Sequence, residues 1–215
     1  MKKIISISGI DGAGKSTQIG FIKKKLLREN KKVFIFWSRI GYTSGFQFIK
    51  DILRLLFRNQ LPKAGNTKKR KKALKNRIVS NLWIFLAIMD LFYYYVIFLR
   101  IKYYTGHNII LDRYLIDSEI DLNINFPSFN YERSILWKVL KLTAIKPNIN
   151  LLLIISPEES IKRSKMKNEP FPDNIETLKS RLDIYEKQSN NLDFKTIWCE
   201  QDIDKIKSHI ISLLN

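Results

Sequence analysis

Residues 4–17 read IISISGIDGAGKST, and these residues indicate the class of fold more clearly than any others in the chain. Ile4 to Ser8 is a β-branched run with the length of a buried strand. Residues 9–16 then fit the pattern of glycine, four residues and Gly-Lys-Ser/Thr, and apolar residues repeat at helical spacing from Ile19 to Leu26. A strand, a glycine-rich turn and an amphipathic helix in this order predict a P-loop, the backbone cradle for the phosphates of a nucleoside triphosphate.

Each residue type in this loop has a chemical task. Glycines let the backbone N–H groups turn inward and let phosphate oxygens approach the chain. Lys15 provides an ammonium group for the β- and γ-phosphates, and the Ser16 hydroxyl is a ligand for Mg²⁺. The predicted nucleotide-binding residues of the loop are Gly9, Ile10, Asp11, Gly12, Ala13, Gly14, Lys15, Ser16 and Thr17.

Further apolar runs alternate with helical patterns along the chain. Val33–Trp37, Ile109–Leu111 and Leu151–Ile155 resemble buried parallel strands, and Phe194–Trp198 is a weaker run of the same kind. Strands that alternate with helices predict an α/β fold, a parallel sheet covered by helices on both faces. The length of 215 residues fits one domain, residues 1–215.

Two local patterns predict where helices begin. Residues 156–159 read Ser-Pro-Glu-Glu, which is the pattern of a capping box with proline at the first helical position. Asp173 with Glu176 gives a second N-cap signal.

The strand ending at Leu111 is followed directly by Asp112. This order places the Asp112 carboxylate at the carboxyl edge of the sheet, where ligands bind in open α/β folds. There it can bind Mg²⁺ or its water ligands together with Ser16, or it can orient the molecule that accepts the phosphoryl group of the nucleotide. A helix-capping aspartate is the structural alternative.

The formal net charge of +18 favours anionic partners such as nucleotides, nucleic acid or an acidic membrane surface. Residues 68–77 form a dense basic cluster, and Leu82–Leu99 is almost entirely apolar around Asp90. We expect residues 64–104 to be a basic and apolar helical segment whose apolar part is a core helix, with peripheral membrane contact as the alternative. The single Cys199 cannot form an internal disulfide, which suits the cytoplasm.

Three stretches together resemble the thymidylate kinase family of P-loop nucleoside monophosphate kinases. Gly9 to Gln18 is similar to that family's own version of the loop, including the acidic third residue. Asp112-Arg113-Tyr114 stands where the family has its Asp-Arg-Tyr/Phe motif, and Pro147–Arg163 resembles its segment from the fourth strand into the following helix.

The resemblance implies a three-layer fold with a five-stranded parallel sheet, ATP as donor, Mg²⁺, a homodimer and a short lid, here at residues 163–174. It also implies that Asp11 faces the acceptor sugar and that Arg39 and Arg113 contact the acceptor phosphate. Because Gly12 stands where some members carry a P-loop arginine, the lid should compensate. The lid candidates for contact with ATP are Arg163, Lys165 and Lys167, and the predicted catalytic residues are Lys15, Asp112, Arg113, Arg39 and Asp11.

The sequence departs from the family on the acceptor side. Arg39 is followed by Ile-Gly-Tyr-Thr and not by the family's Glu-Pro-Gly-Gly-Thr. The family's base-stacking phenylalanine and base-reading arginine correspond by spacing to Ala87 and Leu91, unless a gap moves the arginine to Arg77 or Arg100. Three acidic residues, Asp117, Glu119 and Asp121, crowd the region after the Asp-Arg-Tyr motif.

Three hypotheses follow, in decreasing order of support. The first is phosphoryl transfer from ATP to a nucleoside monophosphate, with dTMP as the leading candidate. The second is a kinase of the same fold for a nucleoside, a sugar phosphate or a lipid-linked phosphate. The third is a non-catalytic nucleotide-binding module at a membrane or nucleic acid, and of these two partners nucleic acid is the less favoured.

Overall fold

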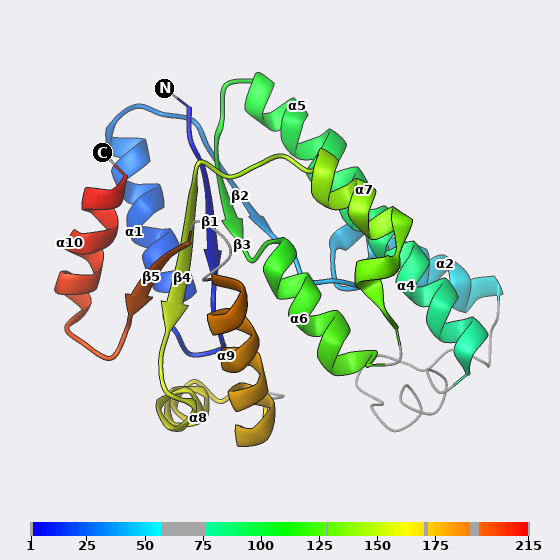
Figure 1. Cartoon of the computed structure of the whole chain (residues 1–215). Coiled ribbons are helices and arrows are strands. Elements are labelled where there is room, and N and C mark those ends of the chain that lie inside the picture. The colour runs from blue at the N-terminus through cyan, green and yellow to red at the C-terminus, as the bar shows by residue number, and fades with distance from the viewer. Residues whose placement is uncertain (1, 57–75, 128, 170–171, 190–193, 215) are drawn as a thin grey trace.

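The computed structural model describes residues 2–56, 76–127, 129–169, 172–189 and 194–214. Its centre is a parallel sheet of five strands in the order β2-β3-β1-β4-β5 (Figure 1). The strands are β1 (Ile4–Ser8), β2 (Val33–Trp37), β3 (Asn108–Asp112), β4 (Ile149–Ile154) and β5 (Phe194–Trp198). The predicted five-stranded parallel sheet is therefore confirmed, including the weak fifth strand.

Helices cover both faces of the sheet, as Figure 1 shows. Successive residues of a strand point to opposite faces, so Ile109 and Leu111 enter one core while Ile110 enters the other. The helices are α1 (Lys15–Arg28), α2 (Ser44–Leu56), α4 (Arg77–Phe92), α5 (Leu99–Tyr104), α6 (Leu115–Asn125), α7 (Ile135–Thr143), α8 (Pro157–Met166), α9 (Ile175–Ser189) and α10 (Ile203–Leu213). This arrangement is the predicted three-layer α/β fold.

Both helix starts predicted from capping patterns are close to the observed ones, but the details differ. Ser156 accepts a hydrogen bond from the Glu159 backbone N–H, whereas the Glu159 side chain pairs with Arg163 and does not close a capping box. At α9 the cap is Asn174, which accepts from the Thr177 N–H. Asp173 instead accepts from Arg181, so its prediction as the N-cap was wrong.

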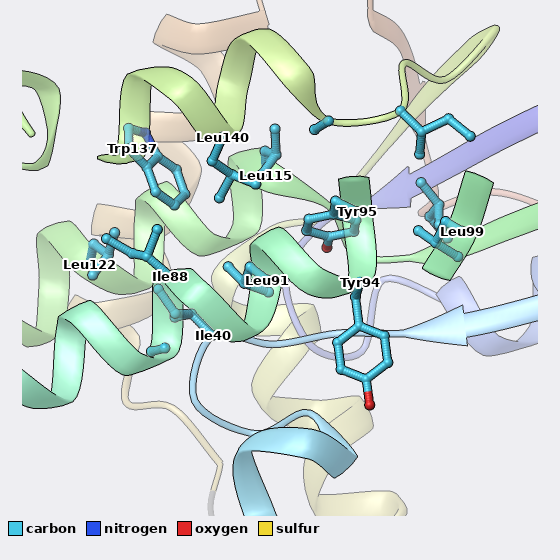
Figure 2. Close-up of a cluster of buried hydrophobic side chains, with 14 of the residues drawn as sticks. Ile40, Ile88, Leu91, Tyr94, Tyr95, Leu99, Leu115, Leu122, Trp137 and Leu140 are labelled. Carbon is cyan, nitrogen blue, oxygen red and sulfur yellow. The ribbon is translucent and has the colours of Figure 1, made fainter. Parts of the chain in front are cut away.

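The apolar segment Leu82–Leu99 lies in one long helix, Arg77–Tyr104, in which α4 passes through a π-helical stretch, Tyr93–Phe98, into α5. Its inner side packs over the sheet and α7, as expected for a core helix (Figure 2). By length and composition alone this helix could cross a membrane, but nearly half of its most apolar 18-residue window is buried in the protein. Of the predicted segment 64–104, residues 64–75, and with them most of the basic cluster 68–77, lie outside the described residues.

Asp90 does not interrupt the core of this helix. Its side chain is buried and accepts a hydrogen bond from the Thr43 hydroxyl, directly before α2. Burial raises the pKa of Asp90 above its ordinary value. The one charged residue of the apolar segment is thus turned toward polar groups of the protein.

Candidate active site

The predicted phosphate loop forms the turn between β1 and α1. Gly9, Gly12 and Gly14 have φ angles of 139°, 78° and 89°, in the region that favours glycine. Gly14 is also the N-cap of α1, so the free N–H groups of that helix open onto the loop. A Cβ atom at Gly9 would lie 2.3 Å from the Leu153 carbonyl oxygen, so only glycine fits there. These glycine conformations and the adjoining helix N-terminus are compatible with the predicted phosphate cradle.

Helix α8 supports the loop from outside. The Ser160 hydroxyl donates to the Asp11 carbonyl oxygen at 2.7 Å, and Arg163 Nη1 donates to the Gly12 carbonyl oxygen at 3.1 Å. Arg163 Nη2 also donates to the Cys199 carbonyl oxygen, which ties the loop to the end of β5. In this structure Arg163 thus supports the backbone of the loop. Its position in the predicted lid indicated contact with ATP and not this contact with the loop.

The rest of the predicted lid, residues 163–174, is only partly described. Residues 163–166 belong to α8, and residues 170–171 lie outside the described residues. Lys165 and Lys167 are exposed on the surface. The structure therefore brings Arg163 to the loop but places neither lysine in contact with it.

Lys15 lies across the mouth of the loop. Its ammonium group donates to the carbonyl oxygens of Gly9 and Ile10, both at 2.8 Å, and lies 3.8 Å from the Asp11 carboxylate. Burial, with the nearby Arg113 charge, lowers the pKa of Lys15 to about 8. The ammonium group makes its hydrogen bonds to backbone carbonyls, and its carboxylate neighbour Asp11 is shared with Arg113, so a polyphosphate would supply further negative charge.

Asp112 stands at the carboxyl end of β3, in register with Ile7 of β1 and Trp37 of β2. Its Oδ1 atom is buried and accepts no hydrogen bond from any residue that the structure describes. Burial raises the pKa of Asp112, although Lys15 acts in the opposite direction. An orphaned buried carboxylate oxygen suits a hard cation, and the exposed Ser16 hydroxyl at the start of α1 is a second ligand of the right type. These residues fit Mg²⁺.

Arg113 follows β3 with a φ angle of 76°, which is unusual for a residue with a side chain. This backbone directs its guanidinium group back to the loop. Arg113 donates to Asp11 through Nη2 and, through Nη1, to Asp117 at 3.1 Å. Burial would raise the pKa of Asp11, but the Arg113 and Lys15 charges outweigh it and hold that pKa below its ordinary value. The predicted residues Asp11, Lys15 and Arg113 thus lie together.

Asp117 is buried and acts as a hub, a single carboxylate that accepts hydrogen bonds from several segments. The sequence identified it only as one of three acidic residues after the Asp-Arg-Tyr motif. Besides Arg113, its carboxylate accepts from the Ser8 hydroxyl at 2.6 Å, the Tyr114 backbone N–H at 2.9 Å and the Tyr185 hydroxyl. These donors come from β1, α9 and the start of α6. Asp117 therefore holds the Arg113 side chain directly, and it also links the three segments that surround this side chain.

Arg39 lies on the far side of the site in a second ion-pair chain. It makes a two-pronged contact with Asp121, from Nε at 2.8 Å and Nη2 at 3.2 Å. Asp121 also pairs with Arg181 at 2.9 Å, and Arg181 pairs in turn with Asp173 at 2.8 Å. The sequence identified Arg39 as a site residue, and the structure adds Arg181 of α9 to its ion-pair chain. The third acidic residue of the stretch, Glu119, faces elsewhere and accepts from Trp137.

A small cavity of about 60 Å³ adjoins Arg39 and Asp121. Trp83 of α4 lines it together with Phe126, and the two rings are stacked with centroids 5.0 Å apart. Ala87 and Leu91, the positions that correspond to the family's base readers, are fully buried in the core and do not line this cavity. Trp83 lies one helical turn before Ala87, so helical spacing was the signal that could have identified it.

Neither a protein-family model nor a curated protein sequence matches the chain. Three similar solved structures are of deoxyadenosine kinase from M. mycoides. The one with products dCMP and a flexible dCDP bound has a TM-score of 0.64 and 20% identity, over 99% of this chain and 98% of that chain. The one with bound dATP has 0.58 and 21%, over 99% of both chains. The one with bound dCTP has 0.57 and 21%, over 99% of this chain and 98% of that chain. At these identities the likeness shows the fold: the chain has the three-layer P-loop architecture of these kinases.

Proposed function

We propose that the protein is a kinase that transfers the γ-phosphoryl group of ATP to a nucleoside monophosphate, with dTMP as the first acceptor to test. The observation that carries the proposal is the pair at the end of β3: the buried Oδ1 of Asp112, which accepts no hydrogen bond from the described residues, and the guanidinium group of Arg113 beside the phosphate loop. A module that only binds nucleotide would use the carboxylate for Mg²⁺, but it has no need of the buried guanidinium group. Phosphoryl transfer does, because it depends on positioning and on neutralising charge around the transferred group.

The donor half of the site divides the work among its own residues. Free backbone N–H groups of the loop and of the first turn of α1 would bind the phosphates, and Lys15 would exchange its bonds to Gly9 and Ile10 for contacts with phosphate oxygens. Ser16 and Asp112 would hold Mg²⁺. When bound, this ion neutralises charge on the β- and γ-phosphates.

The acceptor half supports a phosphorylated acceptor through its arginines. Arg113 pairs with Asp11 of the loop, Arg39 pairs with Asp121, and Arg181 pairs with the same Asp121. An acceptor phosphate would compete with Asp121 for Arg39 and with Asp11 for Arg113. Phosphate is a strong bidentate partner for a guanidinium group, so this exchange is chemically reasonable.

A nucleoside is the second candidate acceptor, and the same ion pairs favour it. Arg39 and Arg181 are already neutralised by Asp121 and Asp173, so an uncharged acceptor needs no exchange of partners. The similar solved structures are of deoxyadenosine kinase. For either acceptor the cavity of about 60 Å³ is smaller than the roughly 300 Å³ of a typical ligand pocket. If the base binds in this cavity, Trp83 or Phe126 has to move to admit it.

The other acceptors, a sugar phosphate or a lipid-linked phosphate, belong to the same test, as does a module that only binds nucleotide. The resemblance to thymidylate kinases also implies a homodimer, and the single cysteine suits the cytoplasm. Both remain predictions.

The experiment is an acceptor panel with purified protein, ATP and Mg²⁺. Release of ADP and the mass of the product are followed with dTMP, the other deoxynucleoside monophosphates, the deoxynucleosides and a sugar phosphate. A phosphorylated monophosphate supports the first proposal, and turnover of deoxynucleosides alone selects the second candidate. ADP release that no acceptor stimulates would contradict a kinase of either kind.

Two variants connect the result to the site. Lys15→Met removes the phosphate-binding ammonium and should lower kcat by about 10³ or more. Asp112→Asn keeps the shape of the side chain but removes its charge, and should lower kcat by about 10² or more. The matched control is Lys24→Met, which removes an exposed lysine from the same helix and should leave kcat unchanged.

A further inference from the structure

Ser38 lies between the two arginines of the acceptor side and is almost completely buried. It follows β2 directly and precedes Arg39 in the chain. Its backbone N–H donates to the Asp112 carbonyl oxygen at 3.1 Å, and its hydroxyl donates to the Arg113 carbonyl oxygen at 3.3 Å. Ser38 therefore joins the backbone beside Arg39 to the backbone of Arg113.

The backbone of Arg113 needs such a contact. Its φ angle of 76° is unfavourable for a residue with a side chain, and such a conformation persists where neighbouring groups hold it. The Arg113 N–H donates to the Ile7 carbonyl oxygen at 3.0 Å, and the Arg113 carbonyl accepts from Ser38. These two contacts hold the backbone from which the guanidinium group reaches Asp11.

The Ser38 hydroxyl has one proton, and its neighbours decide where that proton points. Besides the Arg113 carbonyl, Ser38 Oγ is hydrogen-bonded to the hydroxyl of Tyr95. The carbonyl can only accept, so the Ser38 proton goes to Arg113 and the Tyr95 proton goes to Ser38 Oγ. Burial raises the pKa of Tyr95 well above its ordinary value, so Tyr95 keeps this proton. The three groups therefore form a directed chain of hydrogen bonds.

Tyr95 belongs to the π-helical stretch of the long helix, where Figure 2 shows its ring among buried side chains. The preceding residue, Tyr94, has its hydroxyl 2.7 Å from that of Ser44, at the start of α2. Two consecutive tyrosines thus contact Ser38 and Ser44, the two ends of the segment that carries Arg39. Short π-helical stretches are rare and are frequent at functional sites.

We propose that Ser38 is a positioning residue for phosphoryl transfer. Through its own hydroxyl and the Tyr95 hydroxyl behind it, Ser38 holds Arg39 and Arg113 in the relative positions that the acceptor requires. It acts through these arginines, because its side chain is buried behind them. A displacement of about 1 Å in such groups is enough to slow an enzyme by about 10². The inference rests on the proposed function, in which both arginines meet the acceptor.

The test compares Ser38→Ala with Ser6→Ala in steady-state kinetics, with the acceptor of highest turnover in the panel. Ser6→Ala is the matched control, since it removes another buried serine hydroxyl, one that donates to the Asn150 side chain at 2.7 Å. We expect Ser38→Ala to raise the KM for the acceptor by about tenfold. The KM for ATP should change by less than about twofold, because the loop and Lys15 bind the donor. Ser6→Ala should leave both KM values unchanged.

A double variant separates positioning from stability. In Ser38→Ala the buried Tyr95 hydroxyl loses the one hydrogen-bond partner that it has among the described residues, which should lower the urea midpoint. Ser38→Ala/Tyr95→Phe also removes this hydroxyl, so its urea midpoint should be higher than that of Ser38→Ala. Its KM for the acceptor should remain about tenfold above the wild-type value, because the Arg113 carbonyl still lacks its donor.

Three outcomes would overturn the inference while the wild type still phosphorylates the acceptor. One is an unchanged KM for the acceptor in Ser38→Ala. Another is a double variant that regains the wild-type KM together with its stability, and the third is an equal rise of this KM in Ser6→Ala. Each of the last two would assign the effect to stability alone. A wild type that phosphorylates no acceptor overturns the proposed function, and the role of Ser38 falls with it.

Discussion

Asp117→Asn is the sharpest test of how the site is held together. The Asp117 carboxylate accepts hydrogen bonds from four donors, and one of them is the buried guanidinium of Arg113. Asparagine has one acceptor oxygen and places an N–H₂ group where the other oxygen stood. This N–H₂ group cannot accept the hydrogen bonds of the donors that surround it. Breaking a buried ion pair costs about 3–5 kcal/mol, and Arg113 keeps Asp11 as a partner. We therefore expect Asp117→Asn to lower the free energy of unfolding by about 3 kcal/mol.

The matched control is Glu119→Gln, two positions along the same helix and as deeply buried. Glu119 accepts from the Trp137 N–H and pairs with the exposed Lys141. Glutamine keeps an oxygen for Trp137, and a pair with an exposed lysine contributes at most about 1 kcal/mol. Thermal unfolding followed by circular dichroism should show a decrease in Tm of about 6–12 °C for Asp117→Asn and of less than about 4 °C for the control. Equal decreases in the two variants would refute the role of Asp117 as a hub.

Three further predictions concern the loop. Gly9→Ala should destabilise the fold by at least about 2 kcal/mol in urea unfolding, because its Cβ would meet the Leu153 carbonyl oxygen. Gly20→Ala, with open space on helix α1, should stabilise it by about 0.5–1 kcal/mol. Since the pKa of Lys15 falls from 10.5 to about 8 on folding, the unfolded chain binds more protons between these values. The stability of the wild type relative to Lys15→Met should therefore rise as the pH increases through that window, and a flat difference in urea midpoints would contradict the lowered pKa. Arg163→Ala should lower Tm in thermal unfolding and weaken ATP binding in a titration by about tenfold, because its hydrogen bond to the Gly12 carbonyl is lost. Lys167→Ala, which removes an exposed lysine, should leave both Tm and ATP binding unchanged.

The elements that sequence predicts well are those with a local cause. β1 is buried at every residue, so its apolar run is continuous and easy to identify. β5 lies at the edge of the sheet with partly exposed residues, and its signal is correspondingly weak. The cap of α9 shows the limit. Asp173 and Asn174 are both suitable caps by residue type, and the choice falls to Asn174 because Arg181 engages Asp173.

The candidate site can likewise be predicted where the sequence pattern is local, and not where it depends on distant residues. The phosphate loop is contiguous in sequence, so its residues and their geometry could be predicted together. The hub at Asp117 joins residues as distant as Ser8 and Tyr185, and no local pattern connects them. One signal was present: Asp117 and Asp121 are four residues apart on a helix that starts beside the sheet edge, so they share a face that Glu119 does not.

The helix Arg77–Tyr104 shows what periodicity leaves open. An apolar segment with a single acidic residue is consistent with a core helix or a membrane helix, and Asp90 weighed against the membrane because a carboxylate is costly in lipid. In the fold the inner side of the helix meets the sheet, and the flank that holds Asp90 meets Thr43 at the start of α2. With those two sides occupied, the side centred on Met89 and Tyr93 is left exposed. Core packing therefore explains part of the apolar character of this segment, and the remaining part requires a partner outside the described fold.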